Sequence, residues 1–263
     1  MIPQAYINEW RQKVPWQTSE QVEQDLVICR ALIEIFSDEW LSNSLAFRGG
    51  TALHKLYLHP QPRYSEDIDL VQVRAEPIKE TIQRLQNALA FLGDSSVKPR
   101  RDGTQIISRF DSEFPPSIRL RLKVEANTRE HFSILGLQKF PFEVNSSWFE
   151  GSCNLSTYSL EELLGTKLRA LYQRRKGRDL YDLYIAMKQQ PNLDIDKILH
   201  SYKMYMTFSV KNPPTQREFI LNFESKMQDP EFIGDTKALL RLEMLYDPRE
   251  AYELVKAHLI EKI

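Results

Sequence analysis

The sequence predicts an α/β (α+β) fold in which a mixed sheet flanked by helices is followed by an all-helical C-terminal part. Residues 117–126 alternate polar and apolar side chains, as a strand with one buried face does. Within residues 18–40 apolar side chains recur at steps of three and four, which is typical of an amphipathic helix. Helical patterns also dominate the C-terminal part. We therefore expect two domains, residues 1–155 and 156–263.

The predicted N-terminal helix begins at Thr18, which together with Gln21 has the pattern of a capping box. Its buried face is expected to consist of Val22, Leu26, Cys29, Ile33, Phe36 and Trp40. Further along the chain, two glycines precede a short predicted helix over 51–58. The prolines at 60 and 62 end that helix, because proline cannot continue the backbone hydrogen bonds.

The remaining elements follow from periodicity and capping. Strands are expected at 68–73, 105–110, 117–126 and 140–144, and a helix over 77–92. In the C-terminal part, Ser159 and Glu162 form a second capping-box pattern. Asp247 followed by Pro248 predicts the start of the last helix, with a capping carboxylate before a proline in the first turn.

The composition is that of an ordinary globular protein, because 42% of the 263 residues are apolar and the net charge is −1. A polyanionic partner would therefore need a local basic patch. The two cysteines are too few for a disulfide framework, and the N-terminal residues up to Lys13 lack the apolar core of a signal peptide. No run approaches the ~18 apolar residues of a membrane span. We expect a cytoplasmic protein with no membrane partner.

An acidic pair is the first candidate site. Asp67 and Asp69 are two residues apart on a predicted strand, so both carboxylates point to the same face. Two carboxylates this close repel each other unless a cation lies between them, and hard oxygen donors suit magnesium or manganese. Such a pair is typical of two-metal phosphoryl transfer, although Asp-x-Asp alone is more often a solvated turn.

The residues upstream of the pair strengthen this interpretation. Gly49, Gly50 and Thr51 follow a short apolar segment and precede the predicted helix over 51–58. Glycines at such a place let backbone N–H groups approach phosphate oxygens. The alternative for the two glycines is a plain tight turn. The order of glycines, helix and Asp-x-Asp strand is more informative than any one of these signals.

A third acid is expected on a neighbouring strand. Glu125 ends the alternating strand over 117–126, whose other polar-face residues are basic. We interpret Glu125 as a metal ligand beside Asp67 and Asp69. The alternative is a salt bridge of Glu125 with Arg121 or Lys123 on its own strand.

Lys167 is the second candidate, because it lies in the apolar stripe of the predicted helix after Ser159. A buried unpaired ammonium is costly, so Lys167 either pairs with a carboxylate or faces a cleft that receives anions. It could also extend along the helix to water. Asp179 and Asp182 share a face of the next helix and are near enough in sequence to pair with Lys167 or Arg178.

Residues 167–178 contain six basic residues and no acid. This run could bind triphosphate or an RNA backbone, although most such runs are solvated helix ends and loops. Tyr172, Tyr181 and Tyr184 could stack on bases, although aromatic residues at this spacing are more often packing residues.

These motifs together resemble the AbiEii/AbiGii family of nucleotidyltransferase toxins. The matching segments are FRGGTALHKLY at 47–57, RYSEDIDL at 63–70, KVEAN at 123–127 and LLGTKLRALYQRRKGRDLYDLY at 163–184. The resemblance implies a nucleotidyltransferase-type fold with a helical C-terminal lobe. It also implies the toxin of a toxin–antitoxin or phage-defence pair, a cognate antitoxin, and for some members nucleotide addition to the 3′ end of tRNA.

The resemblance also implies roles for individual residues. The catalytic set would be Asp67, Asp69, Glu125, Lys167 and Asp182, with magnesium or manganese on the first three. The nucleoside triphosphate would be bound by Arg48, Gly49, Gly50, Thr51, Arg63, Ser65, Lys167, Arg178 and Asp179. Thr51 stands where many nucleotidyltransferases have serine. Which of Asp179 and Asp182 is the acid of the last motif stays open.

Two other functions are alternatives to nucleotidyl transfer. In a haloacid-dehalogenase-type phosphohydrolase Asp67 would be the nucleophile, but a hydrophobic strand should then precede it, and residues 63–66 are polar. A non-catalytic module that binds nucleotide, RNA or a partner protein on the same fold is the other alternative. The intact glycine and acid set argues against that module.

Overall fold

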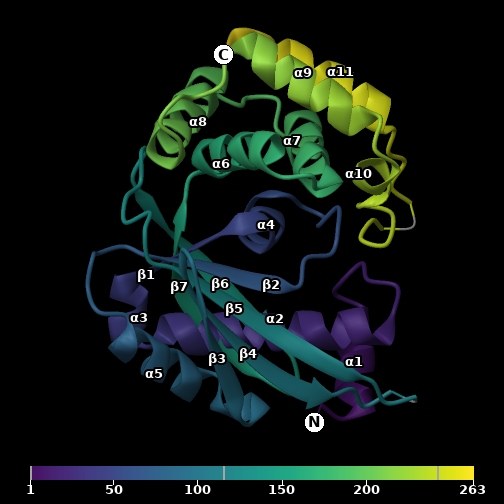
Figure 1. Ribbon diagram of the computed structural model, residues 1–263. Coiled ribbons are helices and arrows are strands. Elements are labelled where there is room, and N and C mark those ends of the chain that lie inside the picture. Colours follow the sequence, from purple (N-terminus) through teal and green to yellow (C-terminus); the bar gives the residue numbers. More distant parts are fainter. Residues whose placement is uncertain (1, 115, 242) are drawn as a thin grey trace. The chain divides into compact units, whose positions relative to one another are not determined.

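The computed structural model describes residues 2–114, 116–241 and 243–263. The described chain divides into two compact units (Figure 1). The N-terminal unit contains the chain up to Phe132 together with Leu137–Tyr158. The C-terminal unit contains Ser159–Ile263 and the short segment Ser133–Gly136. Each unit is described by itself below.

A mixed sheet forms the centre of the N-terminal unit. Its strands lie in the order β3-β4-β5-β2-β1-β7-β6. They are β1 (Leu45–Arg48), β2 (Asp67–Gln72), β3 (Ser95–Arg100), β4 (Gly103–Asp111), β5 (Arg119–Asn127), β6 (Leu137–Asn145) and β7 (Glu150–Tyr158). Strand β2 pairs in parallel with β5 and antiparallel with β1. Strand β2 therefore has a paired strand on each side. The register of these pairs decides which side chains lie beside the polar face of β2.

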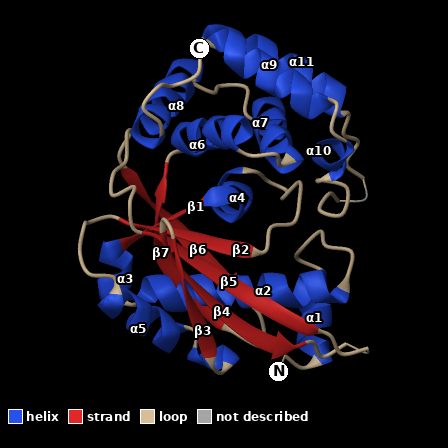
Figure 2. Ribbon diagram, viewed as in Figure 1, coloured by secondary structure: helices blue, strands red, loops and turns tan. Residues whose placement is uncertain are grey.

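Helices lie on both faces of this sheet (Figure 2). They are α1 (Gln4–Arg11), α2 (Ser19–Ser37), α3 (Glu39–Ser44), α4 (Gly49–Ala52), the π-helical turn η1 (Leu53–Tyr57), α5 (Lys79–Ala88) and the 3₁₀ turn η2 (Ala90–Leu92). The long helix α2 packs against β5 and β7. The apolar face of β5 is buried on this side, through Leu120, Leu122, Val124 and Ala126.

The predicted fold class is confirmed, since a mixed sheet flanked by helices precedes a helical C-terminal part. The predicted strands at 68–73, 105–110, 117–126 and 140–144 correspond to β2, β4, β5 and β6. The helix predicted to reach Trp40 ends at Ser37, because Asp38 adopts extended backbone and caps α3 by accepting a hydrogen bond from the Leu41 N–H at 2.9 Å. Strands β1, β3 and β7 were not predicted.

Seven helical segments make up the C-terminal unit. They are α6 (Leu160–Gln173), α7 (Gly177–Gln189), α8 (Ile195–Ser209), α9 (Gln216–Met227), α10 (Pro230–Gly234), α11 (Pro248–His258) and the 3₁₀ turn η3 (Ile260–Lys262), all within the described ranges. Asp247 caps α11 and Pro248 is its first residue, as predicted. In neither unit is any described helix long and apolar enough to cross a membrane.

The carboxylate of Glu162 joins the segment Ser133–Gly136 to the C-terminal unit. It accepts hydrogen bonds from the Ser133 hydroxyl at 2.8 Å and from the backbone N–H groups of Ile134 and Leu135 at 2.7 and 2.9 Å. The Tyr205 hydroxyl donates a further one at 2.7 Å. Ser159 caps α6 as predicted, but the Glu162 side chain makes these contacts instead of closing a capping box.

A buried acid in α2 makes the stability of the N-terminal unit depend on pH. Glu23 is fully buried, and one of its oxygens accepts a hydrogen bond from the Glu113 N–H at 3.2 Å. Its other oxygen has no hydrogen-bond partner among the described residues. Burial raises the pKa of Glu23 to about 7.

Because this pKa is raised on folding, the native state binds the proton more tightly than the unfolded chain. Stability from this group is complete below the unfolded pKa of about 4.5 and is lost as pH rises to about 7. We expect Glu23→Gln to stabilise the protein at pH 8 by on the order of 2 kcal/mol, and to change little at pH 4. Thermal unfolding at the two pH values measures this. The exposed Glu39→Gln is the control, and an equal shift of both variants at pH 8 contradicts the prediction.

Candidate active site

Strand register brings the predicted acids onto one face of the N-terminal unit. Asp67 and Asp69 alternate along β2 with the buried Ile68 and Leu70, so both carboxylates lie on the opposite face from the core. The parallel pairing with β5 places Asp69 opposite Glu125 and Asp67 opposite Lys123. The two strands therefore present three carboxylates and one ammonium side by side.

Lys123 lies between two of these carboxylates. Its Nζ is 2.5 Å from Asp67 Oδ2 and 3.3 Å from Glu125 Oε1. Burial lowers the pKa of Lys123, but the two carboxylates outweigh it and the net pKa is raised. The salt bridge that the sequence offered as an alternative for Glu125 is thus present. Within the described part of the chain, no group of three or more His, Cys, Asp or Glu side chains is arranged to hold a metal ion.

Gln105 on β4 orients Glu125 from the other side. It is buried, and its Nε2 donates to Glu125 Oε1 at 2.8 Å. Its Oε1 in turn accepts from the Arg100 guanidinium at 3.0 Å. The sequence does not single out Gln105, because its one signal is its place on a predicted strand.

The glycine turn fits closely against Asp69. Arg48, the last residue of β1, pairs with Asp69, and Gly49 follows with a φ of 81°. A Cβ at Gly49 would lie 2.1 Å from Asp69 Oδ2, closer than any real contact allows. Both the backbone conformation and the space therefore require glycine at this position.

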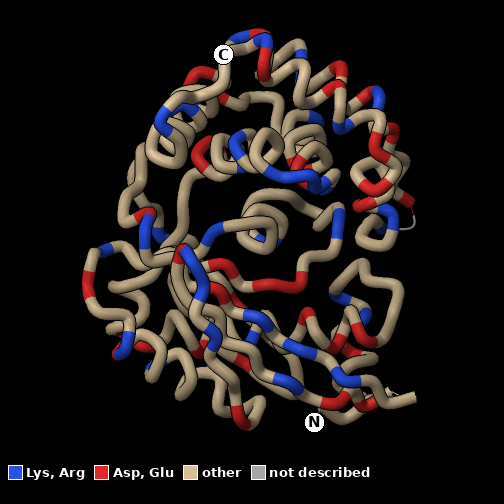
Figure 3. Tube along the Cα trace, in the orientation of Figure 1, with Lys and Arg blue, Asp and Glu red and all other residues tan. Residues whose placement is uncertain are grey.

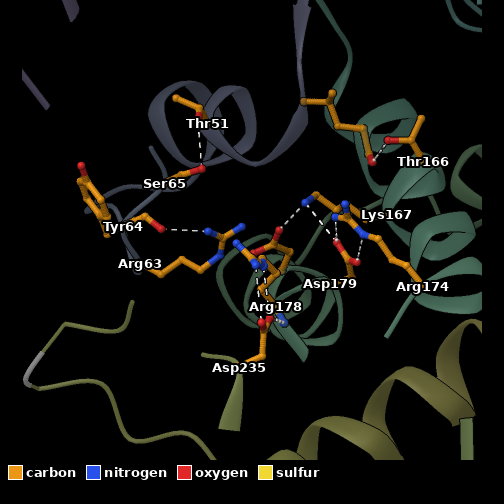
Figure 4. A network of polar contacts seen from close by, with 12 residues as sticks. Thr51, Arg63, Tyr64, Ser65, Thr166, Lys167, Arg174, Arg178, Asp179 and Asp235 are labelled. Carbon is orange, nitrogen blue, oxygen red and sulfur yellow. Dashed lines mark hydrogen bonds and ion pairs between the residues drawn. The ribbon is translucent and has the colours of Figure 1, made fainter. Parts of the chain in front are cut away.

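Two hydroxyls connect the glycine turn to the start of β2. The Oγ1 of Thr51 and the Oγ of Ser65 are 2.8 Å apart (Figure 4). The Thr51 hydroxyl also donates to the backbone carbonyl oxygen of Asp67. The structure thus places Gly49, Thr51 and Ser65 beside the acidic pair, on elements that are far apart in sequence.

The two predicted arginines of this unit differ in environment. The Arg48 guanidinium forms an ion pair with Glu130. Burial lowers the pKa of Arg48, but the Glu130 carboxylate outweighs it and the net pKa is raised. Arg63 is only 2% exposed, and its guanidinium donates to the carbonyl oxygen of Tyr64 at 2.9 Å (Figure 4). Of the two, Arg48 is the more accessible.

A second group of predicted residues lies in the C-terminal unit. Lys167 on α6 pairs with two fully buried acids of α7, at 3.3 Å from Asp179 Oδ1 and 2.7 Å from Asp182 Oδ2. Arg174 also holds Asp179 through two hydrogen bonds of 2.6 and 2.7 Å (Figure 4). Burial raises the pKa of Asp179, but the two cations outweigh it and the net pKa is lowered.

Arg178 does not join this group. Its backbone N–H and its guanidinium Nε both donate to Asp235 Oδ2 at 3.1 Å, a partner that the sequence pattern does not predict. For Tyr181 and Tyr184, the structure shows the packing alternative instead of rings free to stack on bases. Tyr181 and Tyr184 are buried and pack against Tyr246, with ring centroids 4.9 and 5.8 Å apart.

The family model described as "Nucleotidyl transferase AbiEii toxin, Type IV TA system" matches residues 30–256, which include both groups of site residues. This chain belongs to the AbiEii family of nucleotidyltransferase toxins. The resemblance found in the sequence motifs is therefore confirmed. Membership in the AbiEii family implies nucleotidyl transfer, a nucleotide substrate and an antitoxin partner. It gives no support to the phosphohydrolase alternative.

Solved structures share the fold of this AbiEii protein at low sequence identity. MenT4, a nucleotidyltransferase toxin from Mycobacterium tuberculosis H37Rv, is 16% identical with a TM-score of 0.62, over 100% of this chain and 91% of that chain. JHP933 from Helicobacter pylori is 19% identical with a TM-score of 0.58, over 94% of each chain. Among curated proteins, none matches the sequence significantly. The structural matches establish a nucleotidyltransferase-type fold.

Proposed function

We propose that this AbiEii-family protein transfers a nucleotide from a nucleoside triphosphate to a hydroxyl of RNA, as at the 3′ end of tRNA. Divalent metal ions, magnesium or manganese, would be held by Asp67, Asp69 and Glu125. The observation that carries the proposal is the register that places Asp69 opposite Glu125, beside the turn at Gly49. In the cell, a cognate antitoxin would restrain this activity.

The chemistry of the donor atoms suits a divalent cation. Their donors are carboxylate oxygens, which magnesium and manganese prefer. An ammonium already contacts Asp67 and Glu125, so these oxygens are oriented to bind a positive charge. Bound metal would lower the pKa of the attacking hydroxyl and neutralise the leaving pyrophosphate.

The side chains and backbone of the chain supply the rest of the proposed chemistry. The turn at Gly49 and Gly50 would let the backbone approach phosphate oxygens, and the hydroxyls of Thr51 and Ser65 would donate to them. Gln105 would keep the Glu125 carboxylate oriented. In the C-terminal unit, we propose that Lys167, which Asp179 and Asp182 hold in place, contacts nucleotide phosphates.

A labelling experiment tests the proposed function. The protein is incubated with total RNA, magnesium and each common nucleoside triphosphate labelled on the α-phosphate. We expect label on the 3′ end of an RNA and release of pyrophosphate. Label found only on protein, or only on free nucleotide, contradicts the RNA acceptor. Binding of nucleotide without any turnover would support the non-catalytic alternative.

Lys123 is expected to compete with metal for the carboxylates. Removing its charge by Lys123→Met should tighten Mn²⁺ binding in the absence of nucleotide by about fivefold, since a unit charge at 4 Å in water contributes about 1 kcal/mol. Electron paramagnetic resonance titration of free Mn²⁺ measures the affinity. The control is Lys98→Met, because Lys98 is exposed on the same sheet face. Unchanged or weaker Mn²⁺ binding by the Lys123 variant contradicts the competition.

Gly49→Ala is expected to lower transfer roughly a hundredfold, because its Cβ must displace the Asp69 carboxylate by an ångström or more. Gly93→Ala is a matched control. Gly93 has the same φ of 81°, and nothing lies within 4 Å of its added Cβ, so this variant carries the backbone strain without the clash. Steady-state transfer rates of both variants make the comparison. Equal rates would show that the contact with Asp69 is unimportant.

A further inference from the structure

Basic side chains gather on one face of the outer strands of the N-terminal unit. The register of β3, β4 and β5 places them on the same face as Asp67 and Asp69. We call this surface the basic sheet face, and it consists of the basic residues of this face that no acid of the same face neutralises from the outer end, namely Lys98, Arg100, Arg109, Arg121 and Lys123. Figure 3 shows blue Lys and Arg segments in this part of the N-terminal unit. The whole chain has a net charge of −1, so this concentration of positive charge is local.

Two arginines at the centre of this face repel each other. Arg109 and Arg121 are directly opposite across the β4–β5 pair, and both are exposed. Neither forms an ion pair with an acid in the described part of the chain. The next cross-strand pair, Asp111 and Arg119, instead has opposite charges. Both carboxylate oxygens of Asp111 are 2.9 Å from the Arg119 guanidinium. Like charges directly opposite on a sheet destabilise it, so the pair at 109 and 121 is explained better by a ligand than by folding.

The position of the pair relates it to the acids. Arg121 and Lys123 are successive residues of one strand face, so about 6.6 Å separates them along β5, and the same step leads on to Glu125. Arg109 lies one strand further out, about 4.8 Å from β5. A continuous line of cationic side chains thus leads from the outer strands to the carboxylates that we propose as the reacting centre.

The chemistry of the face favours a phosphate backbone over a protein partner. Protein interfaces have apolar and aromatic centres. On β4, the apolar side chain that points to this face is Ile107, which is only 7% exposed and so offers no such centre. Guanidinium groups instead bind phosphates through paired hydrogen bonds.

We propose that the basic sheet face binds the phosphate backbone of the acceptor RNA, with Arg109 and Arg121 contacting consecutive phosphates upstream of the reacting hydroxyl. This inference rests on the proposed function in taking RNA as the acceptor. It adds where the RNA lies and which residues hold it. Neither arginine belongs to the proposed catalytic set.

The test uses the full chain carrying Arg109→Gln and Arg121→Gln together, with Arg119→Gln as the matched control because Asp111 already neutralises that residue. Binding of a fluorescein-labelled single-stranded RNA is measured without nucleotide over a series of salt concentrations. For two lost phosphate contacts, we expect the slope of log affinity against log salt to become shallower by roughly 1.4. The control should change it little.

Two further measurements separate this role from a structural one. The thermal midpoint of the double variant should be unchanged or higher than that of the wild type, since a repulsion is removed. In transfer assays its KM for RNA should rise at least several-fold, while its KM for the nucleoside triphosphate stays the same.

An unchanged salt slope in the double variant overturns the proposal. The proposal is also overturned if the double variant loses binding to poly-glutamate but still binds RNA, because the face would then bind an acidic protein. If the double variant loses RNA affinity while the wild type labels no RNA, the RNA-binding face stands and the proposed transfer to RNA fails. The two conclusions are therefore tested separately.

Discussion

Replacing Asp69 with asparagine is expected to lower nucleotidyl transfer roughly a thousandfold, because a metal ligand stabilises transition-state charge by several kcal/mol. Asparagine keeps the size of the side chain and one oxygen, so the contact with Gly49 is preserved. What is lost is the negative charge opposite Glu125. The fold should be unaffected, because the core side of β2 is formed by Ile68 and Leu70, which alternate with the acids.

The measurement compares initial rates of label transfer for Asp69→Asn and the wild type, together with Mn²⁺ affinity. Asp111→Asn is the control, because this carboxylate is exposed and paired with Arg119 on the same sheet face. We expect the control to keep both transfer and Mn²⁺ binding. Transfer within about threefold of the wild type by Asp69→Asn would remove this residue from the catalytic set.

The second large effect concerns the stability of the C-terminal unit. Lys167→Met leaves the fully buried carboxylates of Asp179 and Asp182 next to each other, while Arg174 still pairs with Asp179. Breaking a buried ion pair by removing one partner typically costs about 3–5 kcal/mol. We expect a loss of this size in the free energy of unfolding, measured with urea by circular dichroism.

A double variant separates this effect from a role in phosphate binding. Lys167→Met combined with Asp182→Asn removes one charge of each sign, so most of the stability should return while transfer stays low. Arg175→Gln is the control for a surface charge, since Arg175 is exposed and pairs with Asp229. A Lys167→Met protein as stable as the control would mean that the buried pair contributes little. Recovery of transfer in the double variant would remove Lys167 from phosphate binding.

The sequence predicted the acidic site because its signals are local. The alternation at Asp67 and Asp69 follows from strand geometry alone. Gly49 is recognisable because few residues can replace a glycine in such a turn, and its φ of 81° bears this out. The pairing of Lys167 with Asp179 and Asp182 follows from the cost of leaving an ammonium unpaired in an apolar stripe.

What the sequence left open depends on pairing between distant segments. Whether Glu125 contacts Lys123 or a metal depends on the register of β5 against β2, which periodicity does not specify. Gln105 becomes important only when β4 lies beside β5. Strand β3 was missed because its exposed residues show no apolar alternation, and its proline is tolerated at a sheet edge.

The anchoring of Ser133–Gly136 by Glu162 limits how this protein can be divided. The chain enters the C-terminal unit for four residues, returns for β6 and β7, and leaves again after Tyr158. A fragment ending at Tyr158 would therefore contain a loop whose two backbone N–H donors to Glu162 have lost their acceptor. The two units are therefore not separable at a single point of the chain. Domain exchange between related toxins must transfer the segment Ser133–Gly136 together with the helices of the C-terminal unit that bind it.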